Sequence, residues 1–527
     1  MRFFVFLFLG VTSVYAHAQK DPSDIQLLGT RSWIRVTWNP APGVDEYRIY
    51  YSEKKTKPGK PVAIVPSNQL QYYIQNAKTN KLYHVWVETW YKNGIKKIST
   101  KTVITQEQWI LDSKELEELE RNPSSAAVPK GMRLFWQDEF NDALLNRNKW
   151  TTHYFSSLNY LSNISKNEML GDKLPQPAFI LNGNTINLYV NDTLPARLYV
   201  PTGSQKISSI QTYDWRTNEN LLNNSRGGYF EVKVKRSKKG SPKGTNTAFW
   251  FDSPGPDLKY YLEKGTVLDG VAGIRPTGQL FEIDVFELLN AQFVLHGHVD
   301  KNGKFIRNLN THIAEGFQHE NEWVTHGMLW TPTAIEHYIN GKLIKAYTDK
   351  HQIYSPNHFM NVFLGTYGSE GGVNMEVDYI RYYTWPLSNG NELPNSGFED
   401  SGSLSPWEGN GKVQPGWGKN HSGGVLLRPG EKIEQYVYLK NDVNYQLNYW
   451  SKGKGQLQVV VNRVTEVSGE LSELTKANAS VKTSFGINSL SFKTDRDYKQ
   501  NMKTIQVLFS NEGKEEIILD EITIKKK

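Results

Sequence analysis

The sequence predicts an all-β protein made of several sandwich domains. Short runs that alternate apolar and polar residues recur along most of the chain, and clusters of Gly, Pro and Asn separate them. Helical periodicity is almost absent outside one short acidic stretch. With 527 residues, the chain is too long for a single hydrophobic core and should divide into about three domains. We therefore expect one large two-sheet sandwich flanked by two smaller β-sandwich domains.

Composition limits the classes of function. The chain has no cysteine, which excludes disulfides, thiolate metal sites and a lipidated N-terminal cysteine. The formal net charge of +7 favours anionic partners, although an ordinary solubility surface would account for it equally well. Because no dense basic block occurs, we expect no nucleic-acid partner.

The N-terminus has the pattern of an export signal. Arg2 precedes an apolar run over residues 3–14, and Ala16 and Ala18 form an Ala-x-Ala cleavage site. We expect residues 1–18 to be a signal peptide, with cleavage after Ala18 and a secreted or periplasmic mature protein. The apolar run is shorter than the ~20 residues that span a bilayer, and no later segment is long and apolar enough, so we expect no membrane anchor.

Residues 20–106 form the first predicted sandwich. Trp38 stands before residues 40–43, which read Pro-Ala-Pro-Gly, and Tyr47 and Tyr51 follow. This arrangement resembles a fibronectin type III domain, which implies a spacer or docking module. Residues 107–130 then form the predicted linker, with a short, helix-prone acidic stretch that we interpret as a solvated face.

The third predicted domain covers residues 391–527. Residues 393–400, followed by Trp407, resemble the opening of jelly-roll carbohydrate-binding modules, and residues 518–524 resemble their last strand. Trp407, Trp417 and Trp450 either stack on sugar rings or pack in the core of this domain.

The central domain, residues 131–386, contains the most informative segment. Glu282, Asp284 and Glu287 interrupt an otherwise apolar strand, and burying such carboxylates without a function would be costly. In a regular strand Glu282 and Asp284 share a face, whereas Glu287, five positions after Glu282, points away. One inserted residue between Asp284 and Glu287 changes the parity, so we predict a β-bulge that brings all three acids to one face.

Two carboxylates on one face are the apparatus of glycoside hydrolysis. One attacks the anomeric carbon, and the other protonates the departing oxygen and then activates water. Retention of configuration requires the two groups to lie about 5–5.5 Å apart. A third acid between them would hydrogen-bond to the nucleophile and couple the titrations, so that one acid stays protonated while another is ionised.

Residues 282–287, Glu-Ile-Asp-Val-Phe-Glu, resemble the bulge-containing active-site motif of glycoside hydrolase family 16. Further landmarks of that family occur in the expected order at residues 136–141, 149–150, 166–168, 228–233, 325–332, 338–341 and 375–381. The resemblance implies a β-jelly-roll (concanavalin-like) sandwich with an open groove and a retaining endo-hydrolase. It implies Glu282 as nucleophile, Asp284 as assisting acid and Glu287 as general acid/base.

The same resemblance implies accessory residues. Trp250 falls where members place an aromatic platform for the sugar, with core packing as the alternative. His296 matches a histidine on the neighbouring strand, with a purely structural histidine as the alternative. No cofactor is expected for catalysis. Many members carry a structural calcium ion, and the matching positions are Glu139, Gly183 and Asp378.

The substrate is predicted from weaker features. Leu288 after the motif, the pair Leu295 and His296, and the basic charge favour a kappa-carrageenase-like enzyme that acts on a sulfated galactan. Arg216 and Arg226 lie in an insertion and are candidate sulfate contacts. Residues 276–281 lack the Trp-Pro and double-Gly context of β-1,3-glucanases. Residues 255–275 also depart from the kappa-carrageenase pattern, which leaves furcellaran-type hybrid carrageenan open.

Several alternatives remain at this point. The enzyme is alternatively a β-agarase, a porphyranase or a laminarinase, since groove loops rather than the acids select the substrate. A transglycosylase uses the same covalent intermediate. A further alternative is a polysaccharide-binding protein without catalytic activity. Such a protein would have no physical reason to keep all three acids. In each case the expected partner is a polysaccharide, and the chain is expected to act as a monomer.

Overall fold

The computed structural model describes most of the chain. The described residues are 25–29, 34–74, 77–78, 81–105, 126–152, 179–194, 206–214, 219–243, 246–252, 267–268, 271–272, 282–287, 292–296, 308–313, 320–348, 360–388, 390–399, 402–465, 469–495 and 502–527. The predicted signal peptide and acidic stretch lie outside them. The chain forms two compact units, residues 1–107 and 108–527.

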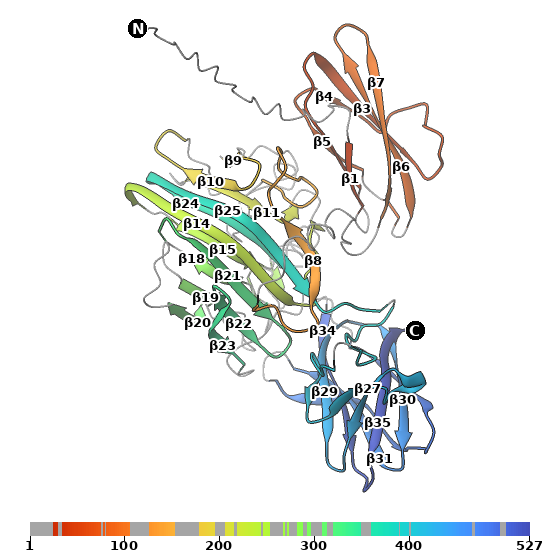
Figure 1. Ribbon diagram of the computed structural model, residues 1–527. Helices are drawn as coiled ribbons and strands as arrows, with labels where there is room; N and C mark the ends of the chain where they lie inside the picture. Colours follow the sequence, from red (N-terminus) through yellow and green to blue (C-terminus); the bar gives the residue numbers. More distant parts are fainter. Residues whose placement is uncertain are drawn as a thin grey trace, which may run out of the picture. The chain divides into compact units, whose positions relative to one another are not determined.

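The first unit is a sandwich of two antiparallel sheets (Figure 1). One sheet has the order β1 (Ile25–Gly29), β2 (Ile34–Trp38), β5 (Gln71–Ile74), and the other β4 (Ala63–Pro66), β3 (Val44–Ser52), β6 (Leu82–Tyr91), β7 (Lys96–Ile104). Trp38 and Tyr47 lie in its core with ring centres 5.0 Å apart. The alternation of apolar and polar residues therefore predicts this sandwich correctly.

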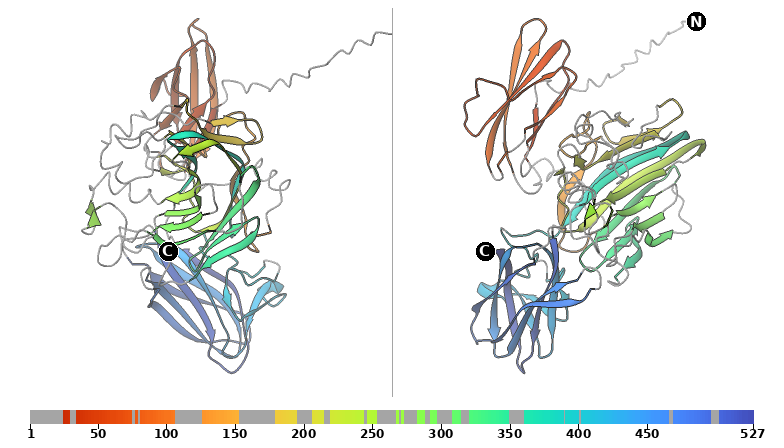
Figure 2. Two further views of the ribbon diagram at one scale, coloured as in Figure 1. Left: turned by 90° about the vertical axis from the view of Figure 1, so that its left-hand side faces the viewer. Right: turned by 180° about the vertical axis from the view of Figure 1, so that it is seen from behind.

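The second unit begins with a large sandwich of two sheets that lie face to face (Figure 2). The eight-stranded sheet has the order β23 (Lys342–Tyr347), β22 (Ile335–Ile339), β21 (Trp323–Trp330), β14 (Gly228–Lys243), β25 (Glu370–Thr384), β10 (Ile186–Val190), β9 (Phe179–Leu181), and β8 (Arg133–Asp138) also pairs with β25. The six-stranded sheet has the order β11 (Lys206–Gln211), β24 (Asn361–Gly368), β15 (Asn246–Asp252), β18 (Glu282–Glu287), β19 (Gln292–His296), β20 (Asn308–Ile313).

The core of this sandwich forms between the two sheets. On β15 the alternate residues Phe249 and Phe251 point into it, and on β24 Val362 and Leu364 do the same. Side chains between these positions therefore face the other side of the six-stranded sheet, because successive residues of a strand alternate between faces. That outer face carries the candidate site. Two short ribbons, β12 (Tyr213–Asp214) with β13 (Glu219–Asn220) and β16 (Val267–Leu268) with β17 (Val271–Ala272), complete the described strands of this domain.

A third sandwich with its own core follows. One sheet has the order β26 (Glu408–Gly409), β29 (Lys432–Lys440), β34 (Met502–Asn511), β31 (Gln456–Val464), β32 (Leu471–Ser480). The other has the order β27 (Lys412–Pro415), β28 (Gly423–Leu427), β35 (Ile517–Lys526), β30 (Asn444–Gly453), β33 (Gly486–Lys493). The only helical element in the described part of the chain is a 3-10 turn, Lys419–His421. None of the described helices is long and apolar enough to cross a membrane.

Candidate active site

The strand β18 contains the predicted bulge. Opposite β19, Asp284 pairs with Val294 and Glu287 with Gln292, so three steps along β18 correspond to two along its partner. The pairing with β15 shifts at the same place. Because both neighbours register one extra residue, the insertion lies in β18 itself, between Asp284 and Glu287, as the sequence predicts.

The bulge divides the strand into two sets of side chains. Ile283, Val285 and Phe286 are fully buried in the core of the sandwich. Glu282, Asp284 and Glu287 take the remaining positions, on the opposite face. Without the extra residue, either Phe286 would leave the core or Glu287 would enter it. The burial of two consecutive apolar residues is thus what brings the three acids together.

Cross-strand pairing fixes the neighbours of the acids. Trp250 of β15 lies directly opposite Asp284, and Asp252 lies directly opposite Glu282. On the far side of β15, Trp250 pairs with Phe363 and Asp252 with Asn361 of β24. Across the sheet, Glu282 is thus in a row with the polar residues Asp252 and Asn361. Asp284 is in a row with the aromatic residues Trp250 and Phe363.

Asp284 is held in an environment that favours its protonated form. Its side chain is 1 % exposed. Burial raises the pKa of Asp284 well above its usual range, and the negative charges of Glu287 and Asp252 raise it further. A protonated carboxyl group can donate a hydrogen bond, which an ionised one cannot. Asp284 is therefore suited to assist a neighbouring carboxylate rather than to attack a substrate itself.

Glu287 is partly exposed and has a defined partner. Nδ2 of Asn246, at the start of β15, donates a hydrogen bond of 3.1 Å to Oε1 of Glu287. This contact orients the carboxyl group of Glu287 on the face that it shares with Glu282 and Asp284.

Trp250 lies on the face of the acids but is 6 % exposed. Its ring stacks on Phe363 at 4.0 Å, and Nε1 donates to the hydroxyl of Tyr367 at 3.3 Å. Tyr367 lies so close over Gly365 that a Cβ there would come within 2.3 Å of the Tyr hydroxyl. Trp250 therefore lies beside Asp284 but belongs to a buried cluster with Phe363 and Tyr367, and its role as a sugar platform stays a prediction.

Phe286, the buried residue next to Glu287 in the bulge, is held by contacts in the core. The guanidinium carbon of Arg236 lies 4.6 Å from the ring centre of Phe286, and the ring of His326 lies 4.4 Å from it. Nη1 of Arg236 also donates to Oγ1 of Thr247 at 3.3 Å. Burial lowers the pKa of Arg236 to about 9, so the group stays cationic at neutral pH and holds Phe286 by a cation–π contact.

The segment that contains these elements matches a known family. Residues 211–381 match the model of glycosyl hydrolases family 16, and this range contains β15, β18, β19 and β24. The chain carries a family 16 glycoside hydrolase domain. Residues 20–105 match the fibronectin type III model, in agreement with the first sandwich. No curated protein matches the chain.

Solved structures of family 16 enzymes are among the similar folds. An endo-β-galactosidase from Clostridium perfringens that releases GlcNAcα1-4Gal is 19 % identical, covers 58 % of this chain and 81 % of its own, and has a TM-score of 0.37. The laminarinase catalytic domain of Thermotoga maritima is 16 % identical, covers 49 % of this chain and 100 % of its own, and has a TM-score of 0.32. Likenesses at these TM-scores establish neither substrate nor mechanism.

His296 is placed by its backbone. It pairs with Glu282 across β18 and β19 in the family 16 domain, with a register shift on the side of β20. This position is next to the first of the three acids, as the sequence predicts. The sugar-binding role of His296 stays a prediction.

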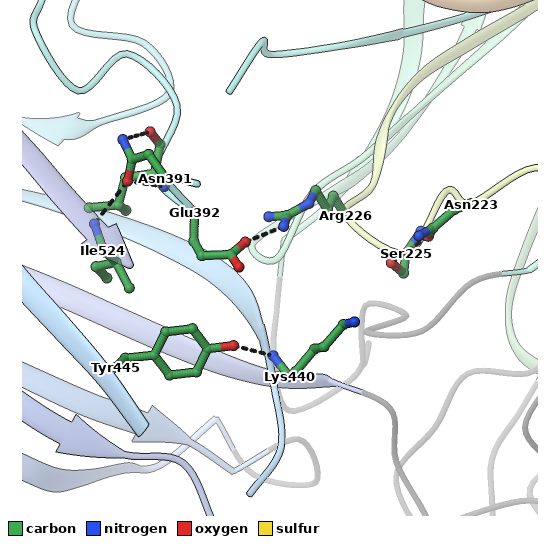
Figure 3. Close-up of polar contacts among 9 residues, drawn as sticks. Asn223, Ser225, Arg226, Asn391, Glu392, Lys440, Tyr445 and Ile524 are labelled. Carbon is green, nitrogen blue, oxygen red and sulfur yellow. Dashed lines mark hydrogen bonds and ion pairs between the residues drawn. The ribbon is translucent and has the colours of Figure 1, made fainter. Parts of the chain in front are cut away.

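Arg226 does not have the predicted partner. Its guanidinium forms an ion pair with Glu392, in the segment that leads into the third sandwich (Figure 3). It also lines a pocket with residues of that segment, among them Trp385 and Trp407. Because Glu392 neutralises its charge there, the structure gives no support to Arg226 as a sulfate contact in the groove, and that role stays a prediction. Arg216 lies outside the described residues.

The predicted calcium ligands are engaged by cations of the protein. Arg381 donates to both carboxylate oxygens of Glu139, at 2.7 and 2.9 Å. Asp378 forms an ion pair of 2.7 Å with Lys233. Gly183 has a φ of +90° in the turn before β10 and offers only its backbone carbonyl. No group of three His, Asp or Glu side chains suited to a metal occurs among the described residues. The side chains of Glu139 and Asp378 therefore do not fit a calcium site.

The three tryptophans of the third sandwich have different surroundings. Trp407 is 3 % exposed, packs against Phe398 and Phe509, and is therefore a core residue. Trp450 is half-buried and lines a surface pocket with Asn448, Thr523 and Lys525. The ammonium group of Lys419 lies 3.8 Å from the ring centre of Trp450. Trp417 is half-buried too, with Lys412 at 5.7 Å.

Two residues of the site are missing from the sequence prediction. Asn246 lies four positions before Trp250 on β15, and Asp252 lies two positions after it, so both share the face of Trp250. The alternation Asn246-Thr247-Ala248-Phe249-Trp250-Phe251-Asp252 contains this signal, since its even positions share one side of the strand. Only the pairing of β15 with β18, which no local pattern predicts, shows that this side meets the acids.

Proposed function

We propose that the family 16 domain is a retaining endo-glycosidase in which Glu282 is the nucleophile and Glu287 the general acid/base. The observation that carries this proposal is the bulge in β18, which directs Glu282, Asp284 and Glu287 to one face while Val285 and Phe286 stay buried. A pair of carboxyl groups on one face, with a third acid between them, supports double displacement.

The reaction would proceed in two steps. A carboxylate oxygen of Glu282 attacks the anomeric carbon, and Glu287 protonates the glycosidic oxygen as the bond to the leaving sugar breaks. The same Glu287, now ionised, takes a proton from water, whose oxygen attacks the anomeric carbon and releases Glu282. Protonated Asp284 would donate a hydrogen bond to Glu282 and stabilise its carboxylate before the attack and again as it is released in the second step.

Isosteric substitutions test the two roles. We expect Glu282→Gln and Glu287→Gln each to reduce turnover by about a factor of a thousand or more. Folding, measured by thermal melting, should be retained. Glu376→Gln is the matched control, because Glu376 lies in the other sheet, where it pairs with Lys235 at 2.9 Å. A normal rate in either active-site variant would refute the assignment.

We further propose that the polymer is a red-algal sulfated galactan, kappa-carrageenan or furcellaran-type hybrid carrageenan, cleaved at β-1,4 linkages. The net charge of +7, Leu288 and the pair Leu295-His296 support this substrate class. Arg226 adds no support for a sulfated substrate, because its guanidinium is paired with Glu392. We also propose that residues 1–18 direct export, which places the enzyme where a polymer can reach it.

A panel of polysaccharides tests the substrate. Release of reducing ends by the mature protein is measured on kappa-carrageenan, furcellaran, iota-carrageenan, agarose, porphyran and laminarin. Release from a carrageenan or furcellaran supports the proposal. Release from laminarin or agarose alone retains the mechanism and rejects the sulfated galactan. Longer products after addition of an acceptor sugar would identify a transglycosylase, and binding without release would favour the non-catalytic alternative.

A further inference from the structure

Asp252 is a buried carboxylate on the active-site face that the three-acid motif does not include. It ends β15 and is the cross-strand partner of Glu282. Its exposed fraction is 2 %. Side chains directly opposite each other on one face of an antiparallel pair have Cβ atoms about 4.5–5.5 Å apart. Asp252 is thus placed beside the nucleophile by the register of the sheet.

The neighbouring strands bring further acids to the face of Asp252. From β18 the titratable neighbours on this face are Glu282, Asp284 and Glu287, and from β19 His296 pairs with Glu282. From β24 the partner of Asp252 is Asn361, which is neutral and fully buried. Four carboxyl groups therefore share one face of two adjacent strands.

We propose that Asp252 is a fourth member of this carboxylate cluster and a positioning residue that acts through Asp284. Carboxylates this close in a buried site cannot all ionise together, so the negative charge of Asp252 keeps a proton on the cluster. The proton resides on Asp284, the most buried of the motif acids, which can then donate to Glu282. Asp252 itself need not touch the substrate.

The electrostatics of Asp284 agree with this role. The charge of Asp252 contributes to the raised pKa of Asp284, after burial and the charge of Glu287. Removing one negative charge from a coupled cluster lowers the apparent pKa values of the acids that remain. Both limbs of a bell-shaped pH profile, the acid and the alkaline one, should then move to lower pH.

The inference rests on the proposed glycosidase activity, and the test separates the two. kcat/KM of the full chain is measured against pH for the wild type, Asp252→Asn and Asp252→Glu, on the polysaccharide that the wild type hydrolyses. We expect both limbs of Asp252→Asn to shift to lower pH by about one unit. Asp252→Glu, which keeps the charge, should restore the wild-type limbs even if its rate is lower.

Asp192→Asn is the matched control, since its side chain is 73 % exposed and its charged neighbour, Lys206, lies 3.8 Å away. Its pH profile should equal that of the wild type. Unshifted limbs in Asp252→Asn, or an equal shift in Asp192→Asn, would overturn the proposal. If Asp252→Asn fails to fold, Asp252→Ser replaces it, and failure of both would make the residue purely structural and overturn the proposal too. A wild type without activity on any polymer would instead reject the glycosidase.

Discussion

Asn246 and Glu287 are joined by a hydrogen bond of 3.1 Å between two neighbouring strands of the six-stranded sheet. The amide lies at the start of β15, and the acid lies just after the bulge of β18. The contact ties the orientation of Glu287, the proposed acid/base, to the strand that also carries Trp250 and Asp252. It shows that β15 as well as β18 builds the site.

Loss of this amide should impair catalysis more than folding. A hydrogen bond to a charged group contributes about 1.5–3 kcal/mol, and each 1.4 kcal/mol of transition-state stabilisation is about tenfold in rate. We expect Asn246→Ala to reduce kcat by about ten- to a hundredfold. Asn187→Ala, which removes a contact to Asn374 in the other sheet, should leave kcat unchanged. Equal rates for Asn246→Ala and the wild type would show that Glu287 is oriented by other groups.

The raised pKa of Asp284 predicts that replacing this acid by a neutral residue increases the stability of the fold and reduces activity. Burial is the main cause, followed by the charges of Glu287 and Asp252. A carboxyl group whose folded pKa exceeds its unfolded value contributes stability that is fully present below the unfolded pKa and is lost as pH rises through the folded pKa. Asp284→Asn should therefore melt at a higher temperature than the wild type at neutral pH, by a margin that grows with pH from about pH 4 upward.

The same variant should lose most of its turnover, because Asn cannot exchange a proton with the cluster. Asp378→Asn serves as the comparison, since Asp378 is 34 % exposed and paired with Lys233. That change removes a surface ion pair and should alter the melting temperature little at any pH. A stability difference for Asp284→Asn that does not vary with pH would contradict the buried, protonated state.

Because Glu139 is paired with Arg381, we expect the stability of the fold to depend on this ion pair and not on a metal ion. The side chains are 9 % and 7 % exposed, and removing one partner leaves a buried, uncompensated charge. We expect Glu139→Gln to destabilise the fold by about 3–5 kcal/mol. Glu376→Gln, at the more exposed pair with Lys235, should cost about 0–1 kcal/mol. Chelator should not change the melting temperature of the wild type; a large rise on adding calcium would show that Glu139 serves a metal.

The pocket beside Trp450 predicts that the third sandwich retains the enzyme on its polymer. Asn448, Thr523 and Lys525 supply polar groups around the indole, and Lys419 adds a positive charge. We expect Trp450→Ala in the full chain to reduce retardation in affinity gels that contain the polysaccharide, with unchanged hydrolysis of short oligosaccharides. Leu471→Ala, at an exposed position in the other sheet, is the control. Equal retardation of all three proteins would remove this role.

The local pattern predicts the acids and the bulge because both depend on neighbouring residues. Val285 and Phe286 are consecutive and both lie in the core, which breaks the alternation of the strand. This break can be seen in the six residues 282–287 alone. The partners of Arg226 and Glu139 could not be predicted, for the opposite reason. Their partners, Glu392 and Arg381, are distant in sequence, and only the folded chain brings the charges together.

The anomeric configuration of the first product tests the central claim most directly. Proton NMR during the initial turnover of the wild type on its polysaccharide shows which anomer forms before mutarotation. Double displacement through Glu282, with Glu287 as acid and then base, predicts that the β anomer appears first from a β-linked polymer. Initial formation of the α anomer would mean a single displacement by water and would contradict the assignment of Glu282 as nucleophile.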